Sequence, residues 1–571
     1  MNILENLVLI DGVDRTDDIY YLMNDENIYD ITFKKGEKKK FLLEQVSMEN
    51  AIRELKPSEV CVLAKGNLLN NISTIVEFPS FFRVFFNSTF YKLYKKEEIE
   101  IQKNFLEEVK NDSIFQYHYE MARNMNVVIK DKMIRLSNYY QQLEIIREDS
   151  ILLKYLHDKN RLSKQEFKHC IFPFGINNAQ LKAVINAFKY NISVIEGAFG
   201  TGKTNTIINI IANAVMYNKS IAVLANENDI KAIYNKLEEY GISFLAYTGS
   251  SQPIPSMEGW LLTNEKFKEK LRIYLKLEID LKNHLAEQEE LMIKTQELEE
   301  IKLEYQKIKK IYSEDYKRKG PSFFKADLGH LASSCGTLNE FYFNNKKIPV
   351  WFKLIDSYAF GVANYHFYDN EIKKIINFYR SKVLLKAIED LESRIYYLKT
   401  RLQSNGIEEL INTCRELSLD MFKHMLALKF KGKIRKNSEY LYDIDKIMED
   451  YPLVLGTPAT IGRIIPNMIY DYVIVDEASN VDITSGILAM SVANHFVVIG
   501  EDKELSISNE LNILNEEVKK KYTVNENYDF KHSLIKSVKS LSNTPVVTYN
   551  EYYINNNFLD KKDDMIELVI Q

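Results

Sequence analysis

Residues 192–216 read ISVIEGAFGTGKTNTIINIIANAVM and decide the fold of this chain. An apolar run, 192–195, precedes the eight residues GAFGTGKT at 197–204, and the helix-forming run 206–216 follows them. This order predicts a strand, a glycine-rich loop and a helix, which is the context that a phosphate-binding loop requires. The glycines allow successive backbone N–H groups to point inward at the start of the helix, where they cup phosphate oxygens.

The loop offers a complete set of groups for holding a nucleoside triphosphate. Lys203 can reach the β- and γ-phosphates, and the hydroxyl of Thr204 can ligate Mg²⁺. The sequence therefore predicts ATP and Mg²⁺ as cofactors, with Lys203 also acting in catalysis. The expected nucleotide-binding residues are Gln180, Gly197, Gly200, Thr201, Gly202, Lys203 and Thr204.

A pair of acidic residues follows a later apolar run. Asp476 and Glu477 come directly after residues 472–475, and open α/β sheets bind ligands at the carboxyl ends of their strands. We expect Asp476 to hold Mg²⁺ through the coordination shell of the ion. Glu477 is expected to orient and deprotonate the attacking water. Taken alone, such a pair also fits the acidic N-cap of a helix. Its position downstream of the phosphate loop favours the catalytic interpretation.

Gln180 lies just ahead of the loop strand, in the stretch FPFGINNAQ at 172–180. A carboxamide offers a donor and an acceptor together, so it can read an adenine edge in a way that a charged group cannot. The alternative is an ordinary glutamine on the surface of a helix.

The order of apolar and helical runs divides the chain into regions. The strand-like residues 220–228 and the helical run 229–241 follow the loop helix, so the β-α-β-α order predicts a doubly wound parallel sheet of the α/β class. Short alternating runs near the start predict a small β-rich module. The expected regions are a β-rich N-terminal module at 1–100, a helical connector at 101–165, an ATP-binding lobe at 166–258 and 451–548, an inserted helical arm at 259–450 and a short tail at 549–571.

The inserted region has a helical pattern of its own. Residues 260–319 contain no Gly and no Pro, and apolar residues from Leu298 to Tyr312 recur at alternating steps of three and four. A second helical run covers 368–404. Two long helices joined by a compact tip predict an antiparallel, coiled-coil arm, and the alternative is one long helix packed on the domain surface.

Composition limits the other classes of function. The chain of 571 residues has a formal charge of −5, so any nucleic-acid contact must come from a local patch. The lysine-rich stretch 429–437 is such a patch, or a solvated loop.

We expect a cytoplasmic protein with no membrane contact, because the start lacks a basic-then-apolar leader pattern and no apolar stretch is long enough to span a bilayer. Four scattered cysteines, without metal-ligand spacing, are expected to be reduced thiols.

Together, these segments resemble the first motor lobe of superfamily 1 helicases. The closest type is the nonsense-mediated-decay and replication-helicase branch of P-loop (AAA-type) domains, in bacterial versions with a long helical insertion. The resemblance is specific over 171–240 and 451–505. It implies a RecA-like lobe that hydrolyses ATP on single-stranded DNA or RNA, with Gln180 contacting adenine. It also implies that the β-rich module and insertion help to grip the strand, and that a nucleic-acid track is lined by Asn226, Asn228, Thr457 and Pro458.

Several positions depart from the family pattern. Ala198 and Phe199 replace two prolines, which phosphate binding through backbone N–H groups should tolerate. Asn480 replaces a glutamine after the acidic pair. Glu504 stands where a glutamine would sense the γ-phosphate, and a carboxylate there repels phosphate unless Mg²⁺ or a basic group compensates.

The end of the sequence shapes the expected function. Ile554 aligns with a family arginine that reaches the γ-phosphate, and the sequence ends at Gln571, so we expect the second motor lobe to be missing or supplied in trans. An arginine finger is worth roughly 10³ to 10⁵ in turnover in related reactions, so hydrolysis by one lobe should be slow and autonomous unwinding is not expected.

Two functions remain open at this point. The first is a nucleic-acid-dependent ATPase subunit of helicase type, completed by a protein partner or by self-association. The second is a catalytically weak ATP-binding regulatory or scaffold subunit of a multi-protein complex. A complex that acts in phage defence is one example, suggested by analogy alone. A degraded remnant is a third reading, against which the well-kept strands and loop argue.

Overall fold

A computed structural model gives the fold of the chain in two compact units. The first unit comprises Met1–Asn264 and Ser418–Gln571, and the second comprises Glu265–Leu417. The structure describes residues 2–549 except 26, 65–66, 70–71, 88–89, 130–131, 163–168, 199, 248–252, 312–327, 361–364, 370, 405, 434–443 and 465–467. Residues 550–571 of the predicted tail, with the Ile554 position, lie outside the described residues, as do Phe199 and part of the lysine-rich stretch. Tyr549, the first residue of the predicted tail, is described and belongs to a strand.

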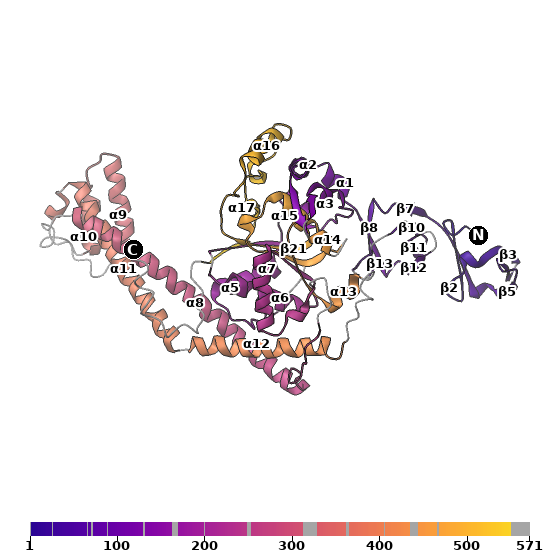
Figure 1. Cartoon of the computed structure of the whole chain (residues 1–571). Coiled ribbons are helices and arrows are strands. Elements are labelled where there is room, and N and C mark those ends of the chain that lie inside the picture. The colour runs from indigo at the N-terminus through magenta and orange to yellow at the C-terminus, as the bar shows by residue number, and fades with distance from the viewer. Residues whose placement is uncertain are drawn as a thin grey trace. The chain divides into compact units, whose positions relative to one another are not determined.

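The N-terminal part of the first unit consists of short antiparallel strands, as the alternating sequence pattern predicts (Figure 1). The strands are β1 (Asn6–Ile10), β2 (Val13–Asp14), β3 (Ile19–Asp25), β4 (Ile28–Phe33), β5 (Lys38–Leu42), β6 (Val46–Asn50), β7 (Arg53–Leu55), β8 (Val60–Ala64), β9 (Asn67–Leu68), β10 (Thr74–Glu77), β11 (Phe81–Phe85), β12 (Tyr91–Lys95) and β13 (Ile99–Lys103). The sheets run β2-β1-β6, β3-β4-β5, β12-β11-β10-β7 and β13-β8-β9.

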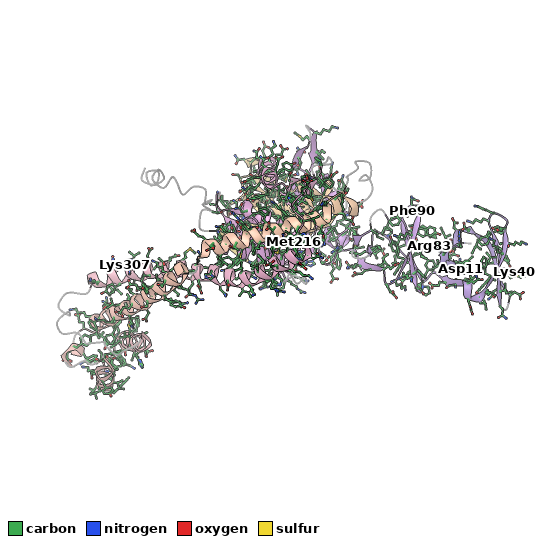
Figure 2. The ribbon with its side chains drawn as sticks, turned by 90° about the horizontal axis from the view of Figure 1, so that it is seen from below. Asp11, Lys40, Arg83, Phe90, Met216 and Lys307 are labelled. Carbon is green, nitrogen blue, oxygen red and sulfur yellow. The ribbon has the colours of Figure 1, made fainter. Side chains whose placement is uncertain are left out.

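A buried arginine joins two of these sheets (Figure 2). Arg83 of β11 is fully buried and donates to the backbone carbonyls of Ile3 and Asn6, the latter at 2.9 Å. It also donates to the carboxylate of Asp14 at 2.8 Å and the hydroxyl of Thr16 at 2.9 Å. A buried guanidinium is tolerated only when paired and hydrogen-bonded, and these partners fix β1 and β2 against β11.

Residues 101–165, expected to be a helical connector, contain a β-hairpin as well as helices. They contain the helices α1 (Leu106–Lys110), α2 (Ser113–Ala122), α3 (Ser137–Gln141) and α4 (Ile151–Leu156), but also a hairpin of β14 (Asn126–Ile129) and β15 (Lys132–Arg135). The β-branched run at 127–129 favours the extended conformation over a helix. The segment is also more than a link, because its apolar residues share a hydrophobic core with the main sheet.

A seven-stranded sheet in the order β18-β19-β17-β20-β21-β16-β22 forms the centre of the first unit. Its strands are β16 (Ile192–Gly197), β17 (Ile221–Leu224), β18 (Ala246–Tyr247), β19 (Leu453–Gly456), β20 (Tyr470–Val475), β21 (Ala493–Gly500) and β22 (Val546–Tyr549). Neighbouring strands are parallel throughout, so their carboxyl ends share one edge. The strands are almost continuously apolar because helices cover both faces. The predicted α/β class with a parallel sheet is confirmed.

Helices pack on both faces of this sheet (Figure 1). One group contains α5 (Asn178–Lys189), α6 (Lys203–Met216) and α7 (Glu227–Glu239), and the other contains α4, α15 (Ile483–Ser491) and α17 (Leu534–Lys539). The remaining helices of this unit include α13 (Ile444–Asp450), α14 (Ile461–Ile464), α16 (Asn509–Lys519) and the 3₁₀ turns η3 (Ser243–Leu245), η6 (Ala478–Asn480) and η7 (Glu526–Tyr528). This doubly wound arrangement leaves the carboxyl edge as the place for a ligand.

The second unit is helical. It contains α8 (Asn264–Ile311), α9 (Leu328–Phe343), α10 (Val350–Phe360), η5 (Tyr365–Asp369) and α11 (Ile372–Ser404), and α12 (Ile407–Phe430) starts within it. Ion pairs Glu287–Arg401 at 3.1 Å, Glu290–Arg394 at 2.8 Å and Lys302–Glu392 at 2.6 Å join α8 to α11. Since residue numbers rise on one helix as they fall on the other, α8 and α11 run antiparallel.

Among the described residues, no helix has the length and apolar character needed to cross a membrane.

Candidate nucleotide-binding site

The glycine-rich loop leaves the start of α6 open. Gly200 and Gly202 have φ angles of +84° and +85°, in the left-handed region that glycine adopts without steric cost. Gly202 is the N-cap of α6, and no side chain caps the helix there. The backbone N–H groups of the first turn therefore remain available for an anion, and the helix dipole favours one.

The loop is braced from within and from the neighbouring strand. The Thr201 hydroxyl donates to the Ala198 carbonyl at 2.8 Å, and Lys203 donates to the Gly197 carbonyl at 3.1 Å. A Cβ atom added at Gly197 would lie 2.8 Å from the Thr201 hydroxyl and 2.9 Å from the Cβ of Tyr549. Only glycine allows β22 to approach the loop this closely.

Tyr549 also fixes the first turn of α6. Its hydroxyl lies 2.7 Å from that of Thr206, and both groups are buried. Burial raises the pKa of the Tyr549 phenol, which therefore stays neutral. The half-buried Thr204 lies in the same helical turn, at the start of α6.

Gln180 contacts the loop through its carboxamide. Its Nε2 donates to the Gly202 carbonyl at 3.3 Å, and its Oε1 accepts from the backbone N–H of Asn177 at 3.0 Å. The side chain of Asn177 in turn caps α5 by accepting from the Gln180 N–H at 2.8 Å. Gln180 is fully buried, so in this structure it ties the start of α5 to the phosphate loop. The expected adenine contact stays a prediction.

The two acidic residues lie at the end of β20, on the same edge of the sheet as the loop. Asp476 is buried, and its Oδ1 accepts from the Glu477 N–H at 3.0 Å. Glu477 has a φ of +48°, which is rare for a residue with a side chain and costs about 1–3 kcal/mol. Such local strain is concentrated at functional sites, where the surrounding structure enforces it.

Lys203 and Glu477 form an ion pair of 2.8 Å between Nζ and Oε1. The pair joins α6 to the end of β20, so the structure brings two of the predicted catalytic residues into direct contact. Burial raises the pKa of Asp476 to about 6, and the charge of Glu477 adds to this effect while the Glu477 N–H and Lys203 oppose it. Lys203, Asp476 and Glu477 thus form one electrostatically coupled group.

The strand order sets the spacing of this group. One strand, β21, separates the loop strand β16 from the acidic strand β20. With neighbouring strands about 4.8 Å apart, the two strand ends lie about 10 Å from each other. That distance leaves room for a terminal phosphate, a cation and a water between them.

The described residues contain no group of three or more His, Cys, Asp or Glu side chains placed to hold a metal ion. Mg²⁺ does not need such a group, because it is usually held by one or two carboxylates together with phosphate oxygens and water. The oxygen donors of Asp476 and Thr204 fit that coordination chemistry.

Glu504, which the sequence placed near the γ-phosphate, has basic partners. His532 Nδ1 lies 2.8 Å from one carboxylate oxygen, and Lys536 pairs with the other. Partial burial alone would raise the pKa of Glu504, but hydrogen bonds with Lys536 and His532 lower it. The compensating basic groups that such a carboxylate requires are therefore present.

A third basic residue lies beside the loop. Lys539, at the end of α17, donates to Glu196 at 2.9 Å and to Asp502 at 2.7 Å. Glu196 directly precedes Gly197, so Lys539 links the loop strand to the residues after β21. The sequence did not point to Lys536 and Lys539, because lysines on a short helix resemble a solvated face. It did not point to His532, because no motif marks that residue.

The residues expected along a nucleic-acid track follow neighbouring strands. Asn226 follows β17 and caps α7 by accepting from the N–H groups of Asn228 and Asp229, both at 3.0 Å. Thr457 follows β19, and its hydroxyl lies 2.7 Å from that of Thr460. These side chains lie on the carboxyl edge with the phosphate loop.

The lysine-rich stretch lies elsewhere. Lys429 donates to Asn218 at 3.2 Å, and burial together with nearby Lys433 lowers the pKa of Lys429. Asn218 follows the C-terminal end of α6, whereas the phosphate loop precedes its N-terminal end. The described part of this cluster is therefore remote from the carboxyl edge of the sheet, where the phosphate loop lies.

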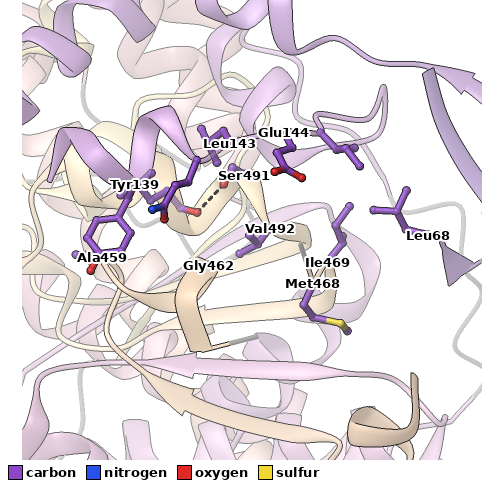
Figure 3. A pocket seen from close by; sticks show the side chains of 13 residues that line it. Leu68, Tyr139, Leu143, Glu144, Ala459, Gly462, Met468, Ile469, Ser491 and Val492 are labelled. Atoms are coloured by element: carbon purple, nitrogen blue, oxygen red, sulfur yellow. Dashed lines mark hydrogen bonds between the residues drawn. The ribbon is translucent and has the colours of Figure 1, made fainter. Parts of the chain in front are cut away.

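A small apolar pocket lies near the amino ends of β20 and β21 (Figure 3). Its lining includes Tyr139 and Leu143 from the segment around α3, Met468 before β20 and Val492 before β21. Because strands of this sheet are parallel, the pocket lies at the opposite edge from the phosphate loop. None of the predicted site residues lines it.

No protein-family model matches the sequence, and a search of curated proteins found no match.

Proposed function

We propose that this chain binds Mg·ATP at the carboxyl edge of the seven-stranded sheet and hydrolyses it. One observation carries the proposal: an uncapped helix start behind two left-handed glycines lies next to the coupled Lys203, Asp476 and Glu477. Backbone N–H groups and a helix dipole suit phosphate, and a lysine beside two carboxylates suits phosphoryl transfer to water.

Each residue has a role in the proposed reaction. Lys203 neutralises the β- and γ-phosphates, and Asp476 and Thr204 would hold Mg²⁺, which would supply further charge neutralisation at the phosphates. Glu477 accepts a proton from the water that attacks the γ-phosphorus, while the bond from that phosphorus to the bridging oxygen breaks and leaves ADP and phosphate. Incoming phosphates compete for Lys203, which opens the Lys203–Glu477 pair and leaves Glu477 able to act as a base.

We further propose a helicase-type, RecA-like lobe that works on single-stranded DNA or RNA. The parallel sheet with β21 between the loop strand and the acidic strand supports this reading. So does the placement of Asn226 and Thr457 on the nucleotide edge, where nucleic acid and ATP would meet. Turnover is expected to increase when a partner lobe, from another protein or another copy, adds a cationic group opposite the γ-phosphate.

The second candidate is a nucleotide-binding regulatory subunit with little turnover. The ion pairs of Glu504 with His532 and Lys536 favour this candidate. Glu504 occupies the position of a γ-phosphate sensor, and these pairs hold its carboxylate against other residues of the chain. Measurement of the rate of ATP hydrolysis separates the two candidates.

The test measures the rate of ATP hydrolysis with and without single-stranded DNA or RNA. We expect a stimulation of tenfold or more, whereas tight binding without turnover supports the regulatory subunit. Glu477→Gln should lower the rate by about 10²–10⁴, because it removes the general base, and leave ATP binding intact. The control Glu239→Gln alters an exposed carboxylate of α7 and should leave the rate unchanged. A normal rate in Glu477→Gln would contradict the assigned mechanism.

A further inference from the structure

One face of α10 in the second unit is apolar and exposed. Residues Val350, Trp351, Leu354, Ile355 and Tyr358 recur at helical spacing and form this face, which we call the α10 face. Tyr358 is 93% exposed and Ile355 64%. Single exposed apolar residues are common on protein surfaces, but five on one helix face mark an interaction site.

The opposite side of α10 is packed against other elements of the second unit. Phe352, Asp356 and Phe360 are spaced by four residues and buried. Phe352 and Phe360 belong to a core shared with α9, η5 and α11. The buried carboxylate of Asp356 accepts from the hydroxyl of Tyr368 at 2.6 Å and from that of Tyr379. These contacts orient α10, so rotating it to bury the exposed face would break them.

The exposed area matches what one partner contributes to a standard protein interface. The end of α9 adds Phe343, which is 78% exposed, and this end lies near α10 because Phe341 packs on Trp351 with ring centroids 6.3 Å apart. With fully exposed aromatic side chains contributing roughly 150–250 Å² each, the α10 face and the end of α9 present roughly 600–900 Å². A standard interface buries about 800 Å² on each partner.

We propose that the α10 face binds the α10 face of a second copy of this chain and forms a twofold-symmetric dimer. None of the five residues of the α10 face is charged, and a row of apolar side chains along one helix is complementary to itself. In an antiparallel pair of α10 helices, Ile355 lies near the twofold axis, and Tyr358 of each copy approaches Trp351 of the other. Tyrosine and tryptophan are the side chains that contribute most at such interfaces.

Sedimentation equilibrium of the full chain tests the proposal. The apparent mass should rise with concentration from 66.9 kDa towards twice that value. Ile355→Asp and Tyr358→Asp each place two unpaired charges in the twofold interface, so each should weaken association by roughly 30-fold or more. The control Tyr396→Asp alters a tyrosine of α11 that is 74% exposed and should leave association unchanged. Circular dichroism of the variants checks that the helices remain folded.

Cross-linking gives a second readout that does not depend on destabilising the face. Ile355→Cys should form a disulfide-linked dimer on oxidation, whereas Tyr396→Cys should not. The proposal is overturned if the wild-type chain stays monomeric at all concentrations, or if the Asp variants dimerise as well as the wild type. Flotation of a monomeric wild type with phosphatidylcholine–phosphatidylserine vesicles, lost in Tyr358→Asp, would instead assign the face to a membrane surface. These measurements use no nucleotide, so their outcome is independent of the proposed ATPase activity.

Discussion

Single residues at the carboxyl edge show how closely the loop is fitted to its neighbours. Gly197 lies between the Thr201 hydroxyl and Tyr549, while Glu477 adopts a left-handed backbone conformation next to Asp476. The sequence motifs single out Lys203, Asp476 and Glu477, and the structure brings Lys203 and Glu477 into direct contact. The sequence could not identify Lys536, Lys539 or the structural contacts of Gln180, which depend on tertiary packing.

Gly197→Ala tests the fit of the loop. The added Cβ would meet a β-carbon and a hydroxyl at distances that real Cβ atoms do not show, so the loop or β22 must shift. We expect a loss of about 1–3 kcal/mol in the free energy of unfolding and a loss of ATP binding. The matched control is Gly336→Ala in α9, where the added Cβ meets nothing within 4 Å. It should stabilise its helix by about 0.5–1 kcal/mol. Unchanged stability in Gly197→Ala would refute the close approach, as denaturant titration can show.

At the scale of elements, the strands and helices around the loop could be predicted, and those of the connector could not. The apolar runs that became β16, β17, β20 and β21 are bounded by turn residues, and fully buried parallel strands leave little ambiguity in such runs. The 126–135 hairpin was missed because short β-branched runs between helices carry weak periodicity. The packing of α2 and α4 onto the sheet domain depends on buried polar contacts that no local pattern reveals.

His118 is one of those contacts and predicts a pH-dependent stability. This residue of α2 is fully buried, with Nδ1 3.0 Å from the Thr484 hydroxyl and Nε2 3.1 Å from the Tyr528 carbonyl. Burial lowers the pKa of His118 to about 3, although its bond to Tyr528 opposes this. In the unfolded chain, the imidazole titrates near pH 6.5. The contribution of buried, neutral His118 to the free energy of unfolding is therefore fully present above about pH 6.5 and is lost as the pH falls towards 3.

Chemical denaturation between pH 7 and pH 5 measures this contribution. Below pH 6.5, His118 should lower the free energy of unfolding by about 1.4 kcal/mol per pH unit. His495, whose pKa burial lowers to about 4, acts in the same direction, so the comparison must be with a variant. In His118→Gln, the free energy of unfolding should fall less steeply with decreasing pH, by about 1.4 kcal/mol per pH unit. Equal slopes in the two proteins would show that His118 can be protonated in the folded state.

At the scale of the whole molecule, the chain combines a seven-stranded parallel sheet in one unit with a helical second unit that carries an exposed apolar face. The long helices were evident in the sequence because residues 260–319 lack Gly and Pro and repeat their apolar positions. The α10 face was not, because residues 350–360 belong to the stretch between the two long helical runs, which the sequence pattern assigned to a loop-like tip, whereas the structure has a helix there. Periodicity shows that a helix has an apolar stripe, but only packing shows whether another element covers it.

Calorimetric titration of the purified chain with a slowly hydrolysed ATP analogue and Mg²⁺ tests the central claim most directly. We predict saturable binding of one nucleotide per chain, loss of binding in Lys203→Ala, and normal binding in the control Lys219→Ala. Lys219 pairs with Asp471 at 3.2 Å, at the opposite edge of the same sheet. An absence of binding in the wild-type chain, or equal binding in Lys203→Ala, would contradict the account.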